Sequence, residues 1–87
     1  MQKIKEMPEI FRFFGFSFYF YSNEHEPIHI HVEGKGAKAK FVWNGKHFDL
    51  YESIGLKTND IKRIQKVIDD NADIITTKWF DYFRNLL

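Results

Sequence analysis

Three of the four histidines lie close together in the sequence, at His25, His29 and His31. If residues 28–33 form a strand, His29 and His31 point to the same face, with side chains about 7 Å apart. Two imidazoles at that separation can converge on one metal ion, and His25 or Glu33 would supply a third ligand. Imidazole and carboxylate ligands suit zinc, nickel or ferrous iron. The spacing therefore predicts a candidate metal site formed by His25, His29 and His31.

The same histidines also suit acid–base chemistry. A neutral and a protonated imidazole held close together can act as base and acid in cleaving an RNA phosphodiester, with a lysine stabilising the developing charge. The candidate catalytic residues are His29, His31 and Lys40, with Lys38 as the alternative cation. A third interpretation makes the histidines half-exposed strand residues, or residues that hydrogen-bond to backbone carbonyls. The sequence leaves the three interpretations open.

Residues near the histidines add candidate ligand contacts. Tyr21 and Glu24 precede His25, and we take these three as candidate ligand-binding residues. Tyr19 and Tyr21 fall on the less apolar face of the strand expected at 11–21, where exposed rings would stack on bases. The rings would otherwise cover the sheet or fill a dimer interface. A basic helix face that would contact phosphates or simply face solvent comprises Lys57, Lys62, Arg63 and Lys66.

The elements that position these residues follow from hydrophobic periodicity. The first half of the chain alternates with period two and the second half repeats near 3.6, which indicates strands followed by helices. The expected strands cover residues 11–21, 28–33, 37–43 and 46–51. On the first of them, one apolar face would carry Phe14, Phe16, Phe18 and Phe20.

Turn signals predict how the strands pair. Asn44-Gly45 favours a two-residue type I′ turn. That turn would pair Trp43 with Lys46, Val42 with His47, Phe41 with Phe48 and Lys40 with Asp49. A similar turn at Lys35-Gly36 would place His31 opposite Lys40 and Ile30 opposite Phe41. The polar face of the sheet would then carry His29, His31, Glu33, Lys38, Lys40, His47, Asp49 and Tyr51.

The second half predicts two helices. Thr58 is the expected N-cap of the first, whose apolar stripe runs to about residue 70. Asn71 begins a second helix or kinks a continuous one. The predicted fold class is α+β: a four-stranded, mainly antiparallel sheet followed by two C-terminal helices packed on its apolar face. We expect a single domain over 1–87, with 1–6 flexible, 9–52 forming the sheet and 58–87 helical.

Composition limits the class of protein. The chain has 87 residues, including ten phenylalanines, four tyrosines and two tryptophans, which is enough aromatic surface to predict a homodimer or a protein partner. The net charge of +1 argues against a general nucleic-acid coat protein. The absence of cysteine excludes disulfides and thiolate chemistry and fits a cytoplasmic location. The charged N-terminus is unlike a signal peptide, and the apolar run at 13–21 is too short to span a bilayer, so we expect no membrane association.

Several motifs together resemble a known family of short bacterial and archaeal proteins, catalogued only as a domain of unknown function. The family pattern is Met-Pro, a Phe-x-Gly strand, an acidic-His-x-Pro-Pro-His-Phe-His-Val box and a tryptophan in the helical end. The matching residues are Met7-Pro8, Ile10, Phe13-Phe14-Gly15, Tyr21, Glu24-His25, Pro27, His29-Ile30-His31 and Trp79. Ile28 and Ile30 replace a proline and a phenylalanine of the box, and Asn71 stands where the family often has another histidine. The first six residues extend beyond the usual start.

The resemblance implies a role beside a second protein. Members of the family are often encoded next to another small protein, in pairs of the toxin–antitoxin type. By that analogy the chain is a toxin-like or regulatory component that acts on RNA, DNA or a cognate protein, with His25, His29 and His31 as its functional centre. The alternatives are a ribonuclease that uses the paired histidines and a metal-binding domain that holds a divalent ion such as zinc.

Overall fold

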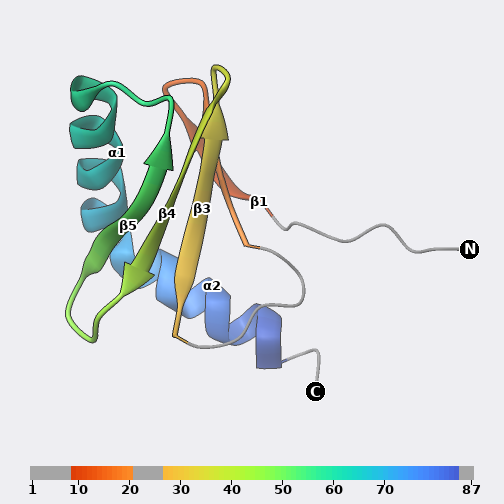
Figure 1. Ribbon diagram of the computed structural model, residues 1–87. Helices are drawn as coiled ribbons and strands as arrows, with labels where there is room; N and C mark the ends of the chain where they lie inside the picture. The colour runs from red at the N-terminus through yellow and green to blue at the C-terminus, as the bar shows by residue number, and fades with distance from the viewer. Residues whose placement is uncertain (1–8, 21–26, 85–87) are drawn as a thin grey trace, which may run out of the picture.

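A computed structural model describes residues 9–20 and 27–84 of the chain. It has the expected α+β architecture, an antiparallel sheet followed by two C-terminal helices (Figure 1). The strands are β1 (Glu9–Phe13), β2 (Phe16–Tyr19), β3 (His29–Gly34), β4 (Ala37–Trp43) and β5 (Phe48–Ile54). The helices are α1 (Thr58–Asp70) and α2 (Ala72–Arg84). The segment 1–6, expected to be flexible, lies outside the described residues.

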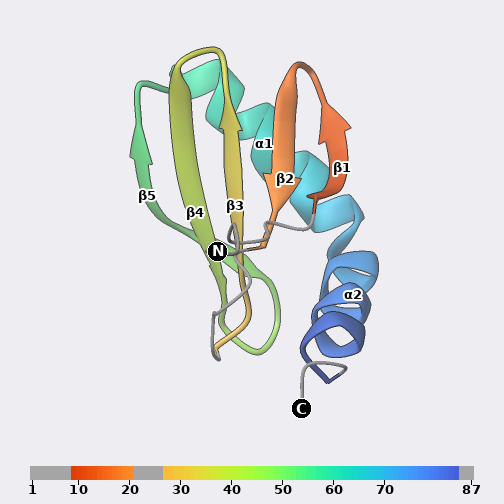
Figure 2. The ribbon, with the colours of Figure 1, turned by 90° about the vertical axis from the view of Figure 1, so that its right-hand side faces the viewer.

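The sheet has five strands in the order β1-β2-β3-β4-β5, one more than predicted. Figure 2 shows the strands side by side with α1 behind them. The additional strand arises because Phe14-Gly15 is a turn within the stretch expected to be one strand: Phe13 pairs with Phe16, and both turn residues have positive φ. The alternating phenylalanines continue through this turn, so periodicity does not reveal it. Phe14 was expected on the apolar face and is instead exposed at the turn.

The pairing of β3 with β4 follows the predicted register. Ile30 lies opposite Phe41 and His31 opposite Lys40. Ile30 and Phe41 are both fully buried. Because side chains alternate across a strand, this register turns His31 and Lys40 to the other face of the sheet.

The pairing of β4 with β5 differs from the prediction. Trp43 pairs with Phe48, so the connection is a loop over 44–47 and not a two-residue turn. The Asn44 side chain causes the difference, because its Oδ1 accepts hydrogen bonds from the backbone N–H groups of Lys46 (2.8 Å) and His47 (2.9 Å). A bulge at Tyr51 then places Glu52, and not Asp49, opposite Lys40.

α1 and α2 are separate helices that meet at Asn71, which confirms the prediction of a second helix over that of one kinked helix. The Asn71 N–H donates to the carbonyls of Val67 and Ile68 at the end of α1, and its own carbonyl accepts from the Ile75 N–H in α2. The predicted N-cap is wrong by one residue. Thr58 is already the first helical residue of α1, so Lys57 occupies the N-cap position. The Lys57 side chain makes no capping hydrogen bond.

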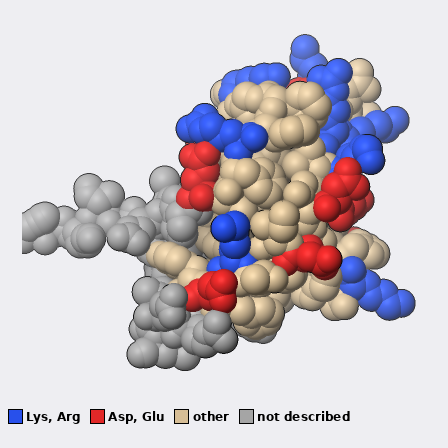
Figure 3. Space-filling view, turned by 180° about the vertical axis from the view of Figure 1, so that it is seen from behind, with Lys and Arg blue, Asp and Glu red and all other residues tan. Residues whose placement is uncertain are grey.

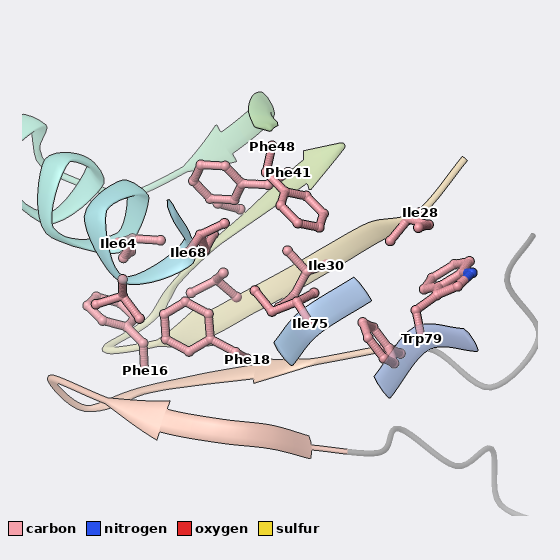
Figure 4. Close-up of a cluster of buried hydrophobic side chains, with 14 residues drawn as sticks. Phe16, Phe18, Ile28, Ile30, Phe41, Phe48, Ile64, Ile68, Ile75 and Trp79 are labelled. Atoms are coloured by element: carbon pink, nitrogen blue, oxygen red, sulfur yellow. The ribbon is translucent and has the colours of Figure 1, made fainter. Parts of the chain in front are cut away.

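The core lies between the sheet and the two helices. It is rich in aromatic and branched side chains, and Figure 4 shows it extending from Phe16 and Ile64 at one end to Trp79 at the other. The Trp79 ring lies 5.1 Å from that of Phe20 and 4.3 Å from that of Phe83, measured between centroids. Among the described residues, both helices contribute buried side chains to this cluster.

Candidate functional site

The candidate site lies on the face of the sheet away from the core, which we call the outer face. Strand pairing gathers polar side chains there: Tyr19 and Lys40 flank His31 on the two neighbouring strands. These three residues line a hollow of about 340 Å³ together with Lys38, Ala39, Glu52, Ser53 and Ile54. Of the residues predicted for the polar face of the sheet, His31, Lys38 and Lys40 line this hollow.

Aromatic packing orients His31. Its ring stacks on that of Tyr19, with centroids 5.6 Å apart and an interplanar angle of 24°. The Tyr19 hydroxyl donates a hydrogen bond of 3.0 Å to Glu33 Oε1. His31 is partly exposed, whereas Tyr19 is buried. The partly exposed His31 ring thus packs against a buried tyrosine ring, which a hydrogen bond to Glu33 holds in place.

His29 is buried, although the sequence placed it on an open polar face. Its ring lies 5.4 Å from the Trp79 ring and 5.4 Å from the His31 ring, measured between centroids. The packing of α2 beside the start of β3 explains the burial, because Trp79 covers the imidazole. His29 Nδ1 lies 2.8 Å from the Pro27 carbonyl oxygen. A carbonyl oxygen only accepts, so Nδ1 carries a proton and donates this hydrogen bond.

Lys40 and Lys38 both provide positive charge at the site, and Lys40 is the register neighbour of His31. On its other side Lys40 lies opposite Glu52. Its ammonium group lies 5.0 Å from the centroid of the Tyr51 ring, a cation–π geometry. The described part of the site therefore combines a buried imidazole, a partly exposed imidazole and a lysine beside a carboxylate. Such a set can transfer protons or bind an anionic or hydrogen-bonding group.

The metal hypothesis concerns residues that the structure describes only in part. His25, Tyr21 and Glu24 lie outside the described residues. Within 9–20 and 27–84, no three His, Cys, Asp or Glu side chains come together in a group that could hold a metal ion. His29 and His31 are close enough to supply two ligands, and a site completed by His25 stays a prediction.

His47 is separated from the other histidines because it lies in the 44–47 loop. Its Nε2 lies 3.0 Å from Asp49 Oδ1, and both side chains line a second hollow of about 460 Å³ with Lys46, Gln65 and Asp69. Sequence reasoning missed Glu52 and Ile54 of the outer-face hollow, because the predicted fourth strand ended at Tyr51. A bulge places Glu52 opposite Lys40, and the alternation of apolar and polar residues in the sequence does not predict that bulge.

Comparison with known proteins gives a family but no activity. A family model described as "Domain of unknown function (DUF4160)" matches residues 15–80, which include β2 to β5, α1 and most of α2. The Met7-Pro8 motif precedes the matched residues. Neither the curated proteins nor the solved structures include a match to the chain. Neither helix in the described residues is long and apolar enough to cross a membrane. The match covers most of the sequence, and the chain belongs to the DUF4160 family.

Proposed function

We propose that this protein is the toxin-like or regulatory component of a toxin–antitoxin-type pair, and that it binds its partner protein on the outer face with the histidines at the centre of the contact. The observation that carries the proposal is the one-sided packing of the sheet. In the described residues both helices contribute to the core on one face, while the other face presents a polar hollow. The resemblance to proteins encoded in such pairs supplies the class of partner.

The edge of the sheet beside this hollow supports binding of an extended segment. β5 is an end strand, so one side of its backbone has no strand partner in the described chain. Its apolar side chains Leu50, Tyr51 and Ile54 are 39%, 67% and 60% exposed. An exposed edge with apolar side chains is a template for strand addition. The carboxylates of Asp49 and Glu52 on the same strand favour a partner segment that combines apolar with basic residues.

The hollow joins this edge to the histidines. Ile54 and Glu52 line one side of it, and His31 and Tyr19 line the other. A side chain from a segment bound at β5 would therefore reach the exposed imidazole across Lys40. In this account His31 contacts the partner, while buried His29 positions it through their ring contact.

The experiment is binding to the purified product of the neighbouring gene, measured by calorimetry. Ile54→Lys introduces a charge at the proposed contact and should weaken binding at least tenfold. Ile74→Lys is the matched control, because Ile74 is also exposed (47%) but lies on α2. His31→Ala should weaken binding as well. A wild-type chain that stays monomeric in light scattering and binds no such protein would refute the proposal, as would equal losses from Ile54→Lys and Ile74→Lys.

A ribonuclease is the second candidate, favoured by the arrangement of three groups. The His29 and His31 rings lie 5.4 Å apart, and Lys40 is the register neighbour of His31. One imidazole would remove the proton of the 2′-hydroxyl and the other would protonate the leaving oxygen, while Lys40 stabilises the phosphorane charge. RNA cleavage that His31→Ala leaves unchanged would eliminate this candidate. The metal-binding alternative is eliminated if metal-free protein has no affinity for zinc or nickel.

A further inference from the structure

The turn between β1 and β2 carries an exposed pair of aromatic rings. Phe13 and Phe14 are 44% and 48% exposed, and their ring centroids lie 4.4 Å apart. Both rings lie at the end of the sheet away from the 44–47 loop, beside the Lys35-Gly36 turn. Both phenylalanine rings therefore remain largely in contact with water and add little to the buried core.

The backbone conformation makes this placement unfavourable for folding. Phe14 has φ +55° and Gly15 has φ +81°, as required at the two central positions of a type I′ turn. Glycine, asparagine and aspartate adopt the first of these positions readily, whereas a bulky side chain is an outlier there. Backbone strain of this kind is a basis for a functional hypothesis, and here the strained residue carries an exposed ring.

Two cations lie at this turn, one against the Phe14 ring and one over Gly15. The Arg63 guanidinium on α1 lies 5.3 Å from the centroid of the Phe14 ring. The Lys35 side chain passes over the turn, with its Cε 3.1 Å from the point where a Gly15 Cβ would lie and its Nζ 5.0 Å from the Phe16 ring centroid. No ion pair in the described part of the chain joins Lys35 or Arg63 to a carboxylate. Figure 3 shows that lysine and arginine side chains gather at this end of the molecule.

We propose that this end of the molecule, formed by Phe13, Phe14, Lys35 and Arg63, binds a single-stranded polynucleotide. An unpaired base would stack on the Phe14 ring, and the flanking phosphates would contact Lys35 and Arg63. Aromatic platforms beside cations are how proteins bind single strands with little sequence preference. A bilayer surface is the less favoured ligand. Recruitment to anionic lipid uses clusters of about 4–8 basic residues, whereas the proposed site contains two, Arg63 against the Phe14 ring and Lys35 against the buried Phe16 ring. This proposal is independent of the partner-binding role of the outer face.

The experiment is fluorescence anisotropy of the full chain with labelled oligonucleotides of about 10 nucleotides, a length within the range of single-strand sites. The chain is tested separately with single-stranded RNA, with single-stranded DNA of the same sequence and with the duplex. Whichever single strand binds more tightly identifies the natural ligand as RNA or DNA. Phe14→Asn removes the ring but suits the turn, so the variant should fold and bind about tenfold or more weakly. Phe80→Ser is the matched control, because Phe80 is 51% exposed on α2, and it should bind as the wild type does.

Charge variants give a second readout that does not depend on the strained turn. Lys35→Gln should weaken binding and lower the slope of log affinity against log salt by about one. Lys46→Gln, in the loop at the other end of β4, removes an equal charge and should leave the slope unchanged. Equal effects of Phe14→Asn and Phe80→Ser would overturn the proposal. So would binding to phosphatidylserine vesicles with none to the oligonucleotides, and so would absence of binding in every arm.

Discussion

Replacing Gly34 with alanine should destabilise the protein because two hairpins meet at this residue. Gly34 lies opposite Phe16, and a Cβ at residue 34 would lie 2.4 Å from the Gly15 carbonyl oxygen, 2.9 Å from Phe16 Cδ1 and 3.0 Å from Phe16 Cα. Two of these atoms belong to the backbone, one in the turn and one at the start of β2, so they cannot move aside by a change of rotamer. Overpacking of this kind costs about 1–3 kcal/mol, and the backbone contacts favour the upper end of that range.

For a domain of this size, 3 kcal/mol corresponds to a fall of about 12–24 °C in Tm. Gly36→Ala is the control, because a Cβ there meets nothing within 4 Å and only the positive φ of +76° opposes it. That strain costs about 1–2 kcal/mol. Urea and thermal unfolding followed by circular dichroism measure both variants. A Gly34→Ala protein as stable as the wild type, or more stable than Gly36→Ala, would refute the close approach of the two hairpins.

Three further variants test packing and turn structure by urea unfolding. His29→Ala removes a buried ring and its hydrogen bond to Pro27, and should cost about 2–3 kcal/mol, whereas His31→Ala should cost about 1 kcal/mol or less; similar losses would contradict the different burial of the two rings. Asn44→Ala removes the acceptor of two backbone N–H groups and should cost about 1 kcal/mol, so an unchanged midpoint would argue against the side-chain-supported loop. Trp79→Ala should cost about 3–5 kcal/mol, and a loss under about 1 kcal/mol would exclude Trp79 from the core.

The sequence predicts those parts of the fold in which the hydrophobic period and the turn residues agree. β4 was predicted with its observed bounds, and Ile30 opposite Phe41 is the register that keeps both side chains in the core. The change of period separated sheet from helices correctly. The predicted Lys35-Gly36 turn correctly placed His31 opposite Lys40, and this pair lies at the centre of the candidate site.

The errors occur where one side chain decides the backbone path. The Asn44 amide closes a longer loop than its Asn-Gly dipeptide predicts. Phe14 occupies a positive-φ position that a phenylalanine rarely adopts, so the first hairpin was predicted as a single strand. The burial of His29 depends on Trp79, which is 50 positions away in the sequence, and no local pattern encodes that contact.

The most direct test of the proposed function is a ¹H–¹⁵N NMR titration of the labelled chain with the product of the neighbouring gene. We predict that the largest shift changes fall on β5 and around the hollow, at Tyr51, Ile54, His31 and Lys40, while amides of α2 near Ile74 change little. Shift changes confined to the helices, or none at a partner concentration well above that of the chain, would contradict binding at the outer face.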